Sequence, residues 1–287
     1  MKRESRDLRL IQPLESGDLA TVYAATDPVY GDVSRAVAVF HGDLADVERV
    51  ATAVQLRVDC ARSIDHPGCV KAEGVYDVAG HPAVVMELVD GKDLERISKR
   101  NAIPAAVMAR VMAGVVEVLI AAKAKGVVHG LLGPTRIRIN EQGQIRVLGL
   151  GVKQGSAVDP SCPLLREERA TRRYAPPEHS RGEWVSAVDI YAIGAILTRT
   201  ISGRWPKRAS SHSAGQTAVA EGAAAVMAHA GASDALVSLV RGCMAFSGDT
   251  RPYFDEIHPI LMAESIGNAE WRAWLSESVL SSTENSE

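Results

Sequence analysis

The predicted secondary structure changes from mainly strands to mainly helices at the stretch MELVDGKDL, residues 86–94. Before it, short β-branched segments bounded by glycine, proline or aspartate are typical of strands. They lie at residues 22–25, 35–40, 70–76 and 83–88. Between the second and the third of them, residues 43–64 repeat apolar side chains near helical spacing, which predicts one inserted helix. The first part of the chain is therefore predicted to be an antiparallel sheet with one helix.

After this stretch, the sequence is mainly that of helices. Residues 104–125 form a long apolar segment that begins with a proline and is followed by a glycine, as helices often are. Short strands are predicted at 127–129, 137–139 and 145–148, and the chain is helical from residue 185 onward. The sequence thus predicts an α+β protein with two lobes, a small antiparallel β lobe with one helix and a larger, mainly helical lobe.

The composition is that of an ordinary globular protein, with 46% hydrophobic residues, 23% charged residues and a net charge of −3. This balance gives no reason to expect a nucleic-acid partner. The four cysteines form no Cys-x-x-Cys pair, which argues against a zinc site and suits a reducing compartment. The start of the chain has no apolar signal core, and Arg110 and Glu117 interrupt the longest apolar run. We therefore expect a cytoplasmic protein with no membrane segment in this chain.

Residues 86–94 resemble the hinge of bacterial serine/threonine protein kinases of the Hanks type. Three further motifs resemble this family in the right order and spacing: YAPPE at residues 174–178, DIYAIG at 189–194 and DTRP at 249–252. Any one of these motifs occurs by chance in many chains, whereas an ordered set over most of the chain is hard to obtain by chance. The sequence is therefore similar to the protein kinase family as a whole.

The resemblance implies the bilobal protein-kinase fold and its division into parts. A kinase-like domain is expected over residues 1–262, with an N-lobe at about 8–86, a hinge at about 87–91 and a C-lobe at about 92–262. The tail, residues 263–287, is expected to be partly disordered because its end is polar and rich in serine. The resemblance gives structural roles to His129, Glu178, Asp189 and Arg251, and it implies an ion pair between Glu178 and Arg251.

The positions that carry phosphoryl transfer in the family hold other residues in this chain. The reaction needs carboxylates for magnesium, a lysine on the phosphates and a base near the hydroxyl group. The resemblance puts a leucine at the base, which cannot accept a proton, and an arginine and a glycine at the two metal ligands, although magnesium prefers oxygen ligands. The degenerate positions are Leu131 (base), Arg136 and Gly149 (metal ligands), Phe40 (lysine) and Arg57 (its partner glutamate).

The nucleotide cleft is expected to be vestigial. Of the three glycines in the family's glycine-rich loop, only Gly17 remains, and Glu15 and Asp18 bring negative charge to the place where phosphates would lie. The positions that line this cleft in the family are Gly17, Val22, Ala38, Glu87 and Val89. We therefore expect no cofactor, no metal ion and no catalytic residue. The sequence is interpreted as a pseudokinase, a degenerate member of the family that is not an enzyme.

The predicted function is that of a catalytically inactive signalling scaffold or allosteric partner of another protein, such as a second kinase or a phosphoprotein. Four arginines of the long loop after the predicted strands could bind a phosphorylated partner; these are Arg166, Arg169, Arg172 and Arg173. The alternative for the loop is a solvated segment partly neutralised by Glu167 and Glu168. The alternative for the whole protein is a divergent nucleotide-binding transferase with non-standard catalytic residues.

Overall fold

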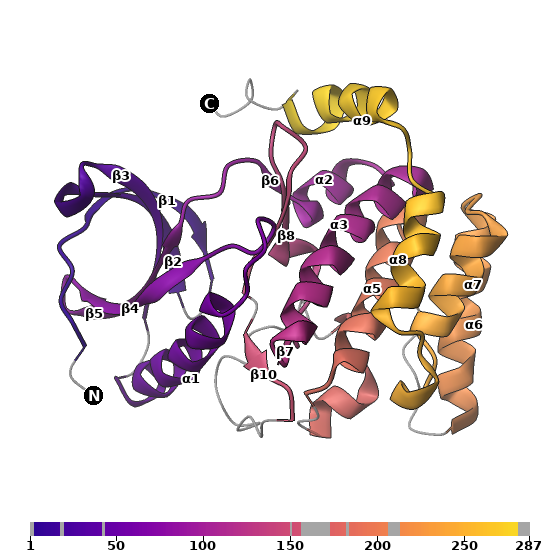
Figure 1. Cartoon of the computed structure of the whole chain (residues 1–287), viewed down its shortest axis with the longest axis horizontal. Helices are drawn as coiled ribbons and strands as arrows, with labels where there is room; N and C mark the ends of the chain where they lie inside the picture. Colours follow the sequence, from indigo (N-terminus) through magenta and orange to yellow (C-terminus); the bar gives the residue numbers. More distant parts are fainter. Residues whose placement is uncertain are drawn as a thin grey trace.

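The chain folds into two lobes joined by one extended segment, as the computed structural model shows (Figure 1). The structure describes residues 3–17, 20–41, 44–149, 151–155, 173–181, 184–205 and 213–280. The N-lobe is an antiparallel sheet with one helix, and the C-lobe is mainly helical. The predicted α+β fold with two lobes is confirmed.

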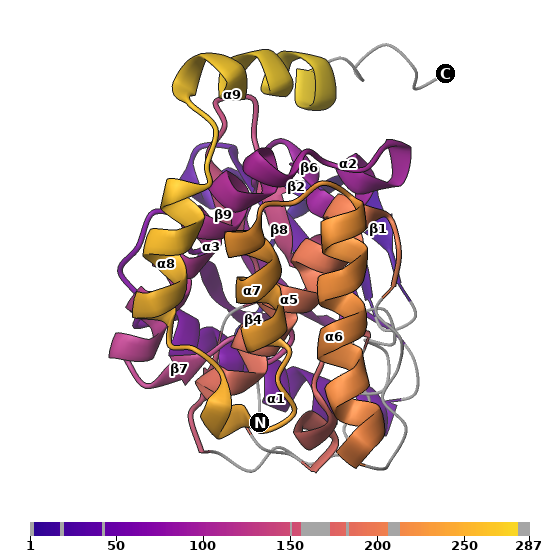
Figure 2. The ribbon, with the colours of Figure 1, turned by 90° about the vertical axis from the view of Figure 1, so that its right-hand side faces the viewer.

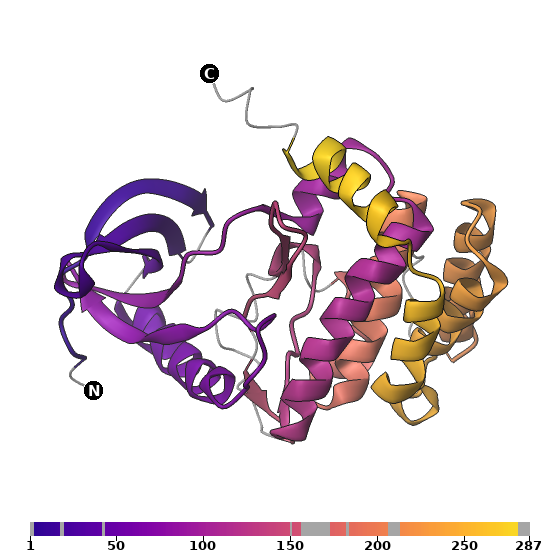
Figure 3. The same cartoon turned by 45° about the horizontal axis from the view of Figure 1, so that its top comes forward.

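The N-lobe sheet has five strands in the order β1-β2-β3-β5-β4, and every neighbouring pair is antiparallel. A turn of 3-10 helix, η1, lies between β2 and β3, and the long helix α1 lies between β3 and β4. Figure 3 shows how strongly the sheet curves and how α1 lies along it. The elements are β1 (Arg9–Ser16), β2 (Ala20–Asp27), η1 (Pro28–Tyr30), β3 (Val33–Phe40), α1 (Leu44–Arg62), β4 (Ala72–Val78) and β5 (His81–Glu87).

Strand β1 was not among the segments predicted as strands. It lies at the edge of the sheet, and six of its eight residues are exposed. An edge strand of this kind does not bury one face, so it lacks the apolar alternation from which strands are predicted. The exposure of β1 at the edge of the sheet therefore explains why its sequence did not predict a strand.

The alternation of side chains along β3 divides the N-lobe core between the two faces of the sheet. On one face Phe40 packs with Val47 and Val50 of α1. On the other face Val37 packs with Val85 of the neighbouring strand β5. Apolar contacts, among them those of Phe40, therefore hold the inserted helix α1 against the sheet.

The segment before β1 covers the free edge of β4. Ser5 forms a parallel bridge with Asp77. The amide of Arg6 donates to the carbonyl of Asp77 at 2.9 Å, and the amide of Asp77 donates to the carbonyl of Glu4 at 2.9 Å. Because a strand edge exposes unpaired amides and carbonyls, this segment protects β4 from pairing with another chain.

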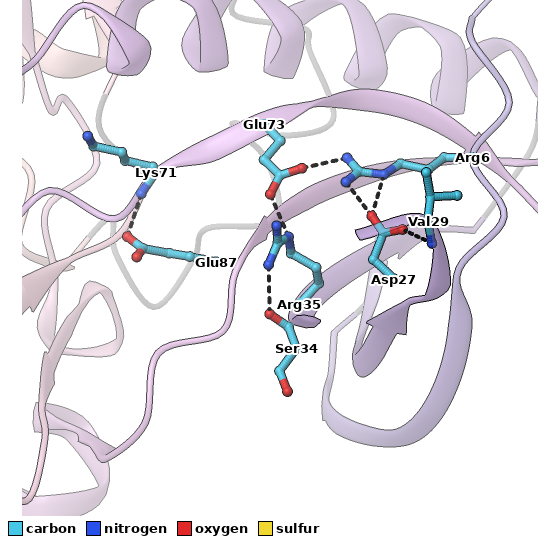
Figure 4. A network of polar contacts seen from close by, with 8 residues as sticks. All are labelled: Arg6, Asp27, Val29, Ser34, Arg35, Lys71, Glu73 and Glu87. Carbon is cyan, nitrogen blue, oxygen red and sulfur yellow. Dashed lines mark hydrogen bonds and ion pairs between the residues drawn. The ribbon is translucent and has the colours of Figure 1, made fainter. Parts of the chain in front are cut away.

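An ion network centred on Arg6 ties this segment to the sheet (Figure 4). Its guanidinium donates to the carboxylate of Asp27 at 3.0 and 2.5 Å and to Glu73 at 2.5 Å. The second oxygen of Glu73 pairs with Arg35 at 2.5 Å. The side chain of Asp27 is fully buried, whereas that of Arg6 is 11% exposed. The network therefore links the N-terminal segment to β2, β3 and β4.

The C-lobe consists of helices packed around α3 and α5, with two small sheets that face the N-lobe. Figure 2 shows α6, α7 and α8 beside one another on the side of α5. The sheets are β6-β8-β9 and β7-β10. The main elements are β6 (Lys92–Asp93), α2 (Leu94–Arg100), α3 (Ala105–Ala124), β7 (Val127–Val128), β8 (Ile137–Ile139), β9 (Ile145–Val147), β10 (Val152–Lys153), α5 (Ser186–Ser202), α6 (Ser213–His229), α7 (Asp234–Cys243), α8 (Phe254–Ala263) and α9 (Asn268–Leu275); the short helical turns are η2 (Pro134–Arg136), η4 (Pro177–Arg181), η5 (Gly248–Thr250) and η6 (Ser276–Leu280).

Helix α3 is the longest helix of the C-lobe and lies in its core. Its side chains Met108, Met112, Val115 and Leu119 are almost fully buried. By length and apolar composition it would also pass as a membrane span, but 61% of that apolar window is buried inside the protein. Its apolar surface is therefore explained by contacts within the lobe.

The tail forms the helix α9 and the turn η6, which lie across the turn between β8 and β9. Trp271 is buried and stacks on Trp274, with ring centroids 5.2 Å apart. Gly143 lies in the turn with φ at +75°, and a Cβ added to it would lie 2.4 Å from the indole nitrogen of Trp271. The turn needs a glycine for its backbone and for this close approach.

Replacing Asp27 by alanine would remove one of the two carboxylate partners of the Arg6 guanidinium, which is mostly buried. Loss of one member of a buried ion pair typically lowers the free energy of unfolding by about 3–5 kcal/mol. The matched control is Arg3→Gln, because Arg3 pairs with Glu48, whose side chain is 44% exposed, and solvent screening leaves an exposed pair with little effect on stability. Denaturant unfolding of both variants measures the difference, and equal losses would contradict the role given to the Arg6 network.

Candidate functional site

The segment that corresponds to the kinase catalytic loop is held by the carboxylate of Asp189 at the start of α5. One oxygen of Asp189 accepts from the amide of His129 at 2.8 Å, and the other accepts from the amide of Gly130 at 2.8 Å. Burial raises the pKa of Asp189 to about 6, although both amide bonds lower it. The carboxylate therefore orients this loop, and it does not face the cleft.

His129 is fully buried and its imidazole is bonded on both sides. Its Nε2 lies 2.9 Å from the carbonyl oxygen of Leu148, and its Nδ1 accepts from the amide of Leu131 at 3.2 Å. These partners require the proton on Nε2, so that Nε2 donates to the carbonyl. Burial, and then the positive charges of Arg57 and Arg136, lower the pKa of His129 to about 3. The ring is neutral and acts as a structural part of the loop.

Leu131 stands at the position of the family's base, and it belongs to a small apolar cluster. It is 4% exposed and packs with Val128, Val152 and Trp184. The preceding residue, Gly130, has φ at +75°, and a Cβ added to it would lie 2.1 Å from the Trp184 ring. The loop backbone at Gly130 thus packs directly against the Trp184 indole, and Leu131 contributes to the apolar cluster.

Phe40 stands at the position of the family's lysine and fills a buried place between β3 and α1. It is 5% exposed. Its neighbours on α1, Val47 and Val50, are apolar as well. In the family an ion pair would connect this strand to the helix, and here apolar contact connects them.

Arg57 stands at the position of the partner glutamate, and its side chain reaches from α1 to the C-lobe. Its guanidinium donates to the carbonyl of His129 at 3.2 Å and, by a shorter bond, to that of Gly149. Sequence reasoning treated Arg57 only as a lost glutamate and did not foresee this contact. No local pattern could have revealed it, because the partners lie 72 and 92 residues away in the chain.

Arg136 and Gly149 stand at the two metal-ligand positions, and they are neighbours. A Cβ added to Gly149 would lie 3.7 Å from one terminal nitrogen of Arg136. The amide of Leu148, next to Gly149, donates to the carbonyl of Arg136 at 2.8 Å. In the part of the chain that the structure describes, no group of three or more histidine, cysteine, aspartate or glutamate side chains could hold a metal ion.

The five predicted cleft residues lie in the connection from β1 to β2, on β2, on β3, at the end of β5 and in the connection between the lobes. Val22 and Ala38 are directly paired across β2 and β3. Gly17 is exposed and its amide donates to the carbonyl of Ala20 at 2.9 Å. Glu87 accepts from the amide of Lys71 at 2.8 Å and pairs with Arg146 on β9; Val89, which follows it, is buried.

The predicted ion pair between Glu178 and Arg251 is present at 2.5 Å, and both side chains are buried. Arg251 also donates to the carbonyl oxygens of Ala187 at 2.7 Å and Ala245 at 2.9 Å. Its guanidinium lies 5.0 Å from the ring centre of Tyr191. Arg251 therefore joins the segment after the long loop to α5 and to the turn before η5.

Of the four loop arginines, only Arg173 lies within the described residues. Its guanidinium lies 4.9 Å from the ring of Trp205, which Arg199 approaches to 5.4 Å. Tyr174 lies against the same ring at 5.0 Å. Arg166, Arg169 and Arg172 fall outside the described residues, as does Asp18 of the glycine-rich loop.

The family described as "Protein kinase domain" matches residues 9–260 of the chain. This chain belongs to the protein kinase family. Its fold agrees with that of the Mycobacterium tuberculosis PknI kinase domain, with a TM-score of 0.68 over 90% of this chain and 96% of that one, at 17% sequence identity.

The curated relatives of this kinase-family chain are bacterial. The "Probable serine/threonine-protein kinase CE0033" of Corynebacterium efficiens is 30% identical over 200 residues, which are 67% of this chain and 30% of that protein. The "Probable serine/threonine-protein kinase PknB" of Lactococcus lactis is 26% identical over 200 residues, 69% of this chain and 32% of that protein. The chain thus spans about a third of the length of these relatives.

These relatives contradict the prediction that the chain is not an enzyme. Each is named as a serine/threonine protein kinase, at 30% and 26% identity, so membership in this family points to an enzyme. The prediction rested on the residue types at the five degenerate positions, which are Leu131, Arg136, Gly149, Phe40 and Arg57. The Hanks-type family itself is confirmed.

The buried, neutral state of His129 has a consequence for stability. Because folding lowers its pKa to about 3 from an ordinary value of 6.5, its contribution is complete above pH 6.5 and is lost as the pH falls through the interval toward 3. The stability difference between the native protein and His129→Gln should therefore shrink below pH 6.5, by up to about 1.4 kcal/mol per pH unit. Urea unfolding at pH 7, 6 and 5 measures it, and a difference that stays constant would contradict this account.

Restoring the family's lysine at Phe40 should destabilise this protein. An ammonium group at a site that is 5% exposed, next to the apolar residues of α1, loses its hydration without gaining a carboxylate. We expect Phe40→Lys to lower the free energy of unfolding by at least about 3 kcal/mol, whereas the control Phe40→Leu should lower it by about 1 kcal/mol. Denaturant titration checks both, and a Phe40→Lys variant as stable as Phe40→Leu would show that Phe40 does not act through packing.

Proposed function

We propose that this chain works in bacterial signalling as a scaffold or allosteric partner of another protein, with the kinase fold as its binding framework. One observation carries the proposal. The buried contacts that hold the C-lobe framework are present, with Asp189 on the loop amides and Arg251 on Glu178. The positions that would face a phosphate group hold the apolar side chains of Leu131 and Phe40.

The partner that fits best is a phosphorylated protein, such as a second kinase that has phosphorylated itself. Arginine pairs with phosphate through two parallel hydrogen bonds, and this geometry favours it over other cations. The long loop carries four arginines, and one of them, Arg173, lies near the Trp205 ring, which Arg199 also approaches. The cytoplasm is the proposed location, where thiols such as Cys60, Cys69 and Cys243, which form no disulfide, stay reduced.

The names of the relatives favour a second candidate, a divergent nucleotide-binding transferase. Such an enzyme would use residues other than the family's usual ones, because Leu131 cannot serve as a base. The two candidates differ in a simple assay. With ATP and a divalent cation, the transferase would label a protein substrate, and a substitution in the cleft would remove the signal.

Replacing Arg166, Arg169 and Arg172 by glutamine should weaken binding to a phosphorylated partner. The probe is a PknB-type kinase from the same bacterium, used after autophosphorylation and again after phosphatase treatment. We expect the phosphorylated probe to bind the native chain at least about tenfold more tightly than it binds the triple variant, since each charge-assisted bond contributes about 1.5–3 kcal/mol.

The control for this experiment is Arg62→Gln, because Arg62 is an exposed arginine at the end of α1 and is not one of the four loop arginines. It should bind like the native chain in a calorimetric titration. Equal affinity for the phosphorylated and dephosphorylated probes, or an unchanged affinity of the triple variant, would refute the phosphoprotein partner.

A further inference from the structure

The tail packs beside the connection between α2 and α3, and a cavity lies between them. Helix α9 lies next to α2 in Figures 1 and 3. The cavity has a volume of about 180 Å³, and its walls come from the end of α2, the connection and the tail. Sites for drug-sized molecules are larger, about 300–1,000 Å³, so this cavity suits a smaller molecule. The lining residues are Ile97, Asn101, Ala102, Ile103, Trp274, Glu277 and Ser278.

The wall that the tail provides is held to the C-lobe by one apolar face. Trp271, Leu275 and Val279 are buried at a spacing of four residues, which puts them on one side of a helical segment. The guanidinium of Arg110 on α3 lies 5.1 Å from the ring centre of Trp271. The tail residues that line the cavity therefore have a defined position.

The opposite wall is held in place as well. Helix α2 ends before Asn101, whose backbone is extended. The amide of Ile103 donates to the carbonyl of Thr200 on α5 at 2.9 Å. The side chains of Ile97 and Ile103 are buried in the lobe. Neither wall can move into the space without breaking these contacts, so the cavity persists in the folded chain.

One part of the cavity lining is apolar and includes an aromatic ring. Ile97 and Ile103 offer aliphatic surface, and Trp274 offers its indole. Trp274 is stacked on Trp271 with ring centroids 5.2 Å apart, and an aromatic ligand gains from such ring contacts in addition to the area it buries. An engineered apolar cavity of about 150 Å³ binds benzene. The present volume therefore suits a single ring or two fused rings.

The polar groups of the lining favour a ligand that donates hydrogen bonds. Asn101, Glu277 and Ser278 can all accept a hydrogen bond, whereas the carboxylate of Glu277 cannot donate one. Asn101 and Glu277 are exposed, so this part of the cavity faces solvent. Because Glu277 also interacts within the chain, the preference for a donor depends on it only in part.

We propose that this cavity binds a small aromatic molecule that carries a hydrogen-bond donor, either a neutral N–H or O–H group or an ammonium group. The ligand contacts the tail and the connection between α2 and α3 at once, so its binding strengthens the attachment of the tail to the C-lobe. The lining includes none of the predicted cleft residues. This inference goes beyond the proposed protein partner and does not depend on it.

The experiment is calorimetric titration of the full chain with three probes: indole, tryptamine and indole-3-acetate. We expect indole and tryptamine to bind. Indole-3-acetate should bind at least about tenfold more weakly than tryptamine, because its carboxylate meets that of Glu277. Equal affinity for indole and tryptamine identifies a neutral donor as the preferred group, and tighter binding of tryptamine identifies an ammonium group.

Amide hydrogen exchange locates the bound molecule. Tryptamine should slow the exchange of the amides in η6, because the ligand joins the tail to the lobe and makes local opening less frequent. Binding that leaves exchange in the tail unchanged would place the ligand elsewhere and contradict the proposal.

A cavity-filling substitution separates binding from stability. Ser278→Leu should lower the affinity for indole at least about tenfold without lowering the melting temperature, because the cavity has room for the larger side chain. Asn101→Ala removes a polar partner and should lower the affinity about three- to tenfold. The control is Ala273→Leu, because Ala273 is exposed on α9 and does not line the cavity. If Ser278→Leu detaches the tail, Ala102→Leu on the opposite wall provides the same test.

Three results would overturn the proposal. The first is the absence of binding of both indole and tryptamine at millimolar concentration. The second is native affinity in a folded cavity-filling variant, because the bound molecule would then not occupy this space. The third is binding of indole-3-acetate as tight as that of tryptamine, because the polar groups would then not select a donor.

Discussion

The carboxylate of Asp189 is the group on which the centre of this molecule depends. It is 1% exposed, and a buried carboxylate is destabilising unless hydrogen bonds compensate for its lost hydration. Its two oxygens accept from two successive backbone amides, those of His129 and Gly130. The loop between β7 and η2 is therefore attached to the first turn of α5. Both oxygens of the carboxylate are used in this attachment, which fixes the backbone of the loop at these two residues.

The contacts that surround this loop extend from that attachment to both lobes. The ring of His129 bonds to the carbonyl of Leu148, beside Gly149. Arg57 of the N-lobe bonds to the carbonyls of His129 and Gly149. A second link between the lobes runs from Glu87 to Arg146. Arg57 thus links α1 to the C-lobe, and the pair of Glu87 with Arg146 links the end of β5 to β9.

Motifs predicted the parts of the structure whose contacts follow from family-wide geometry. The ion pair of Glu178 with Arg251 and the structural role of Asp189 were implied by the resemblance of their motifs to those of protein kinases. Contacts peculiar to this chain were not predictable, because their partners are distant in sequence and have no periodic signal. The bonds of Arg6 to Asp27 and Glu73 span 21 and 67 residues. The packing of Leu131 against Trp184 likewise depends on a loop conformation that only the folded chain reveals.

The names of the relatives reflect the family and its fold, whereas the residues of the cleft bear on the chemistry of this chain. Family membership rests on the order of elements and on the framework contacts around Asp189 and Arg251. The chemistry of the cleft depends on a few side chains, and these side chains do not make the framework contacts of Asp189 and Arg251. Phe40 and Leu131 have become part of apolar clusters, so a change at either position alters packing as well as chemistry.

Amide hydrogen exchange at His129 and Gly130, measured without nucleotide or partner, tests this central claim most directly. If Asp189 holds the loop by itself, both amides exchange only when the whole C-lobe opens, at the rate of the buried amides of α5. ATP and magnesium should leave that rate unchanged. Exchange of these two amides that is orders of magnitude faster than in α5, and that slows when nucleotide is added, would contradict the account, because the loop would then owe its conformation to a ligand.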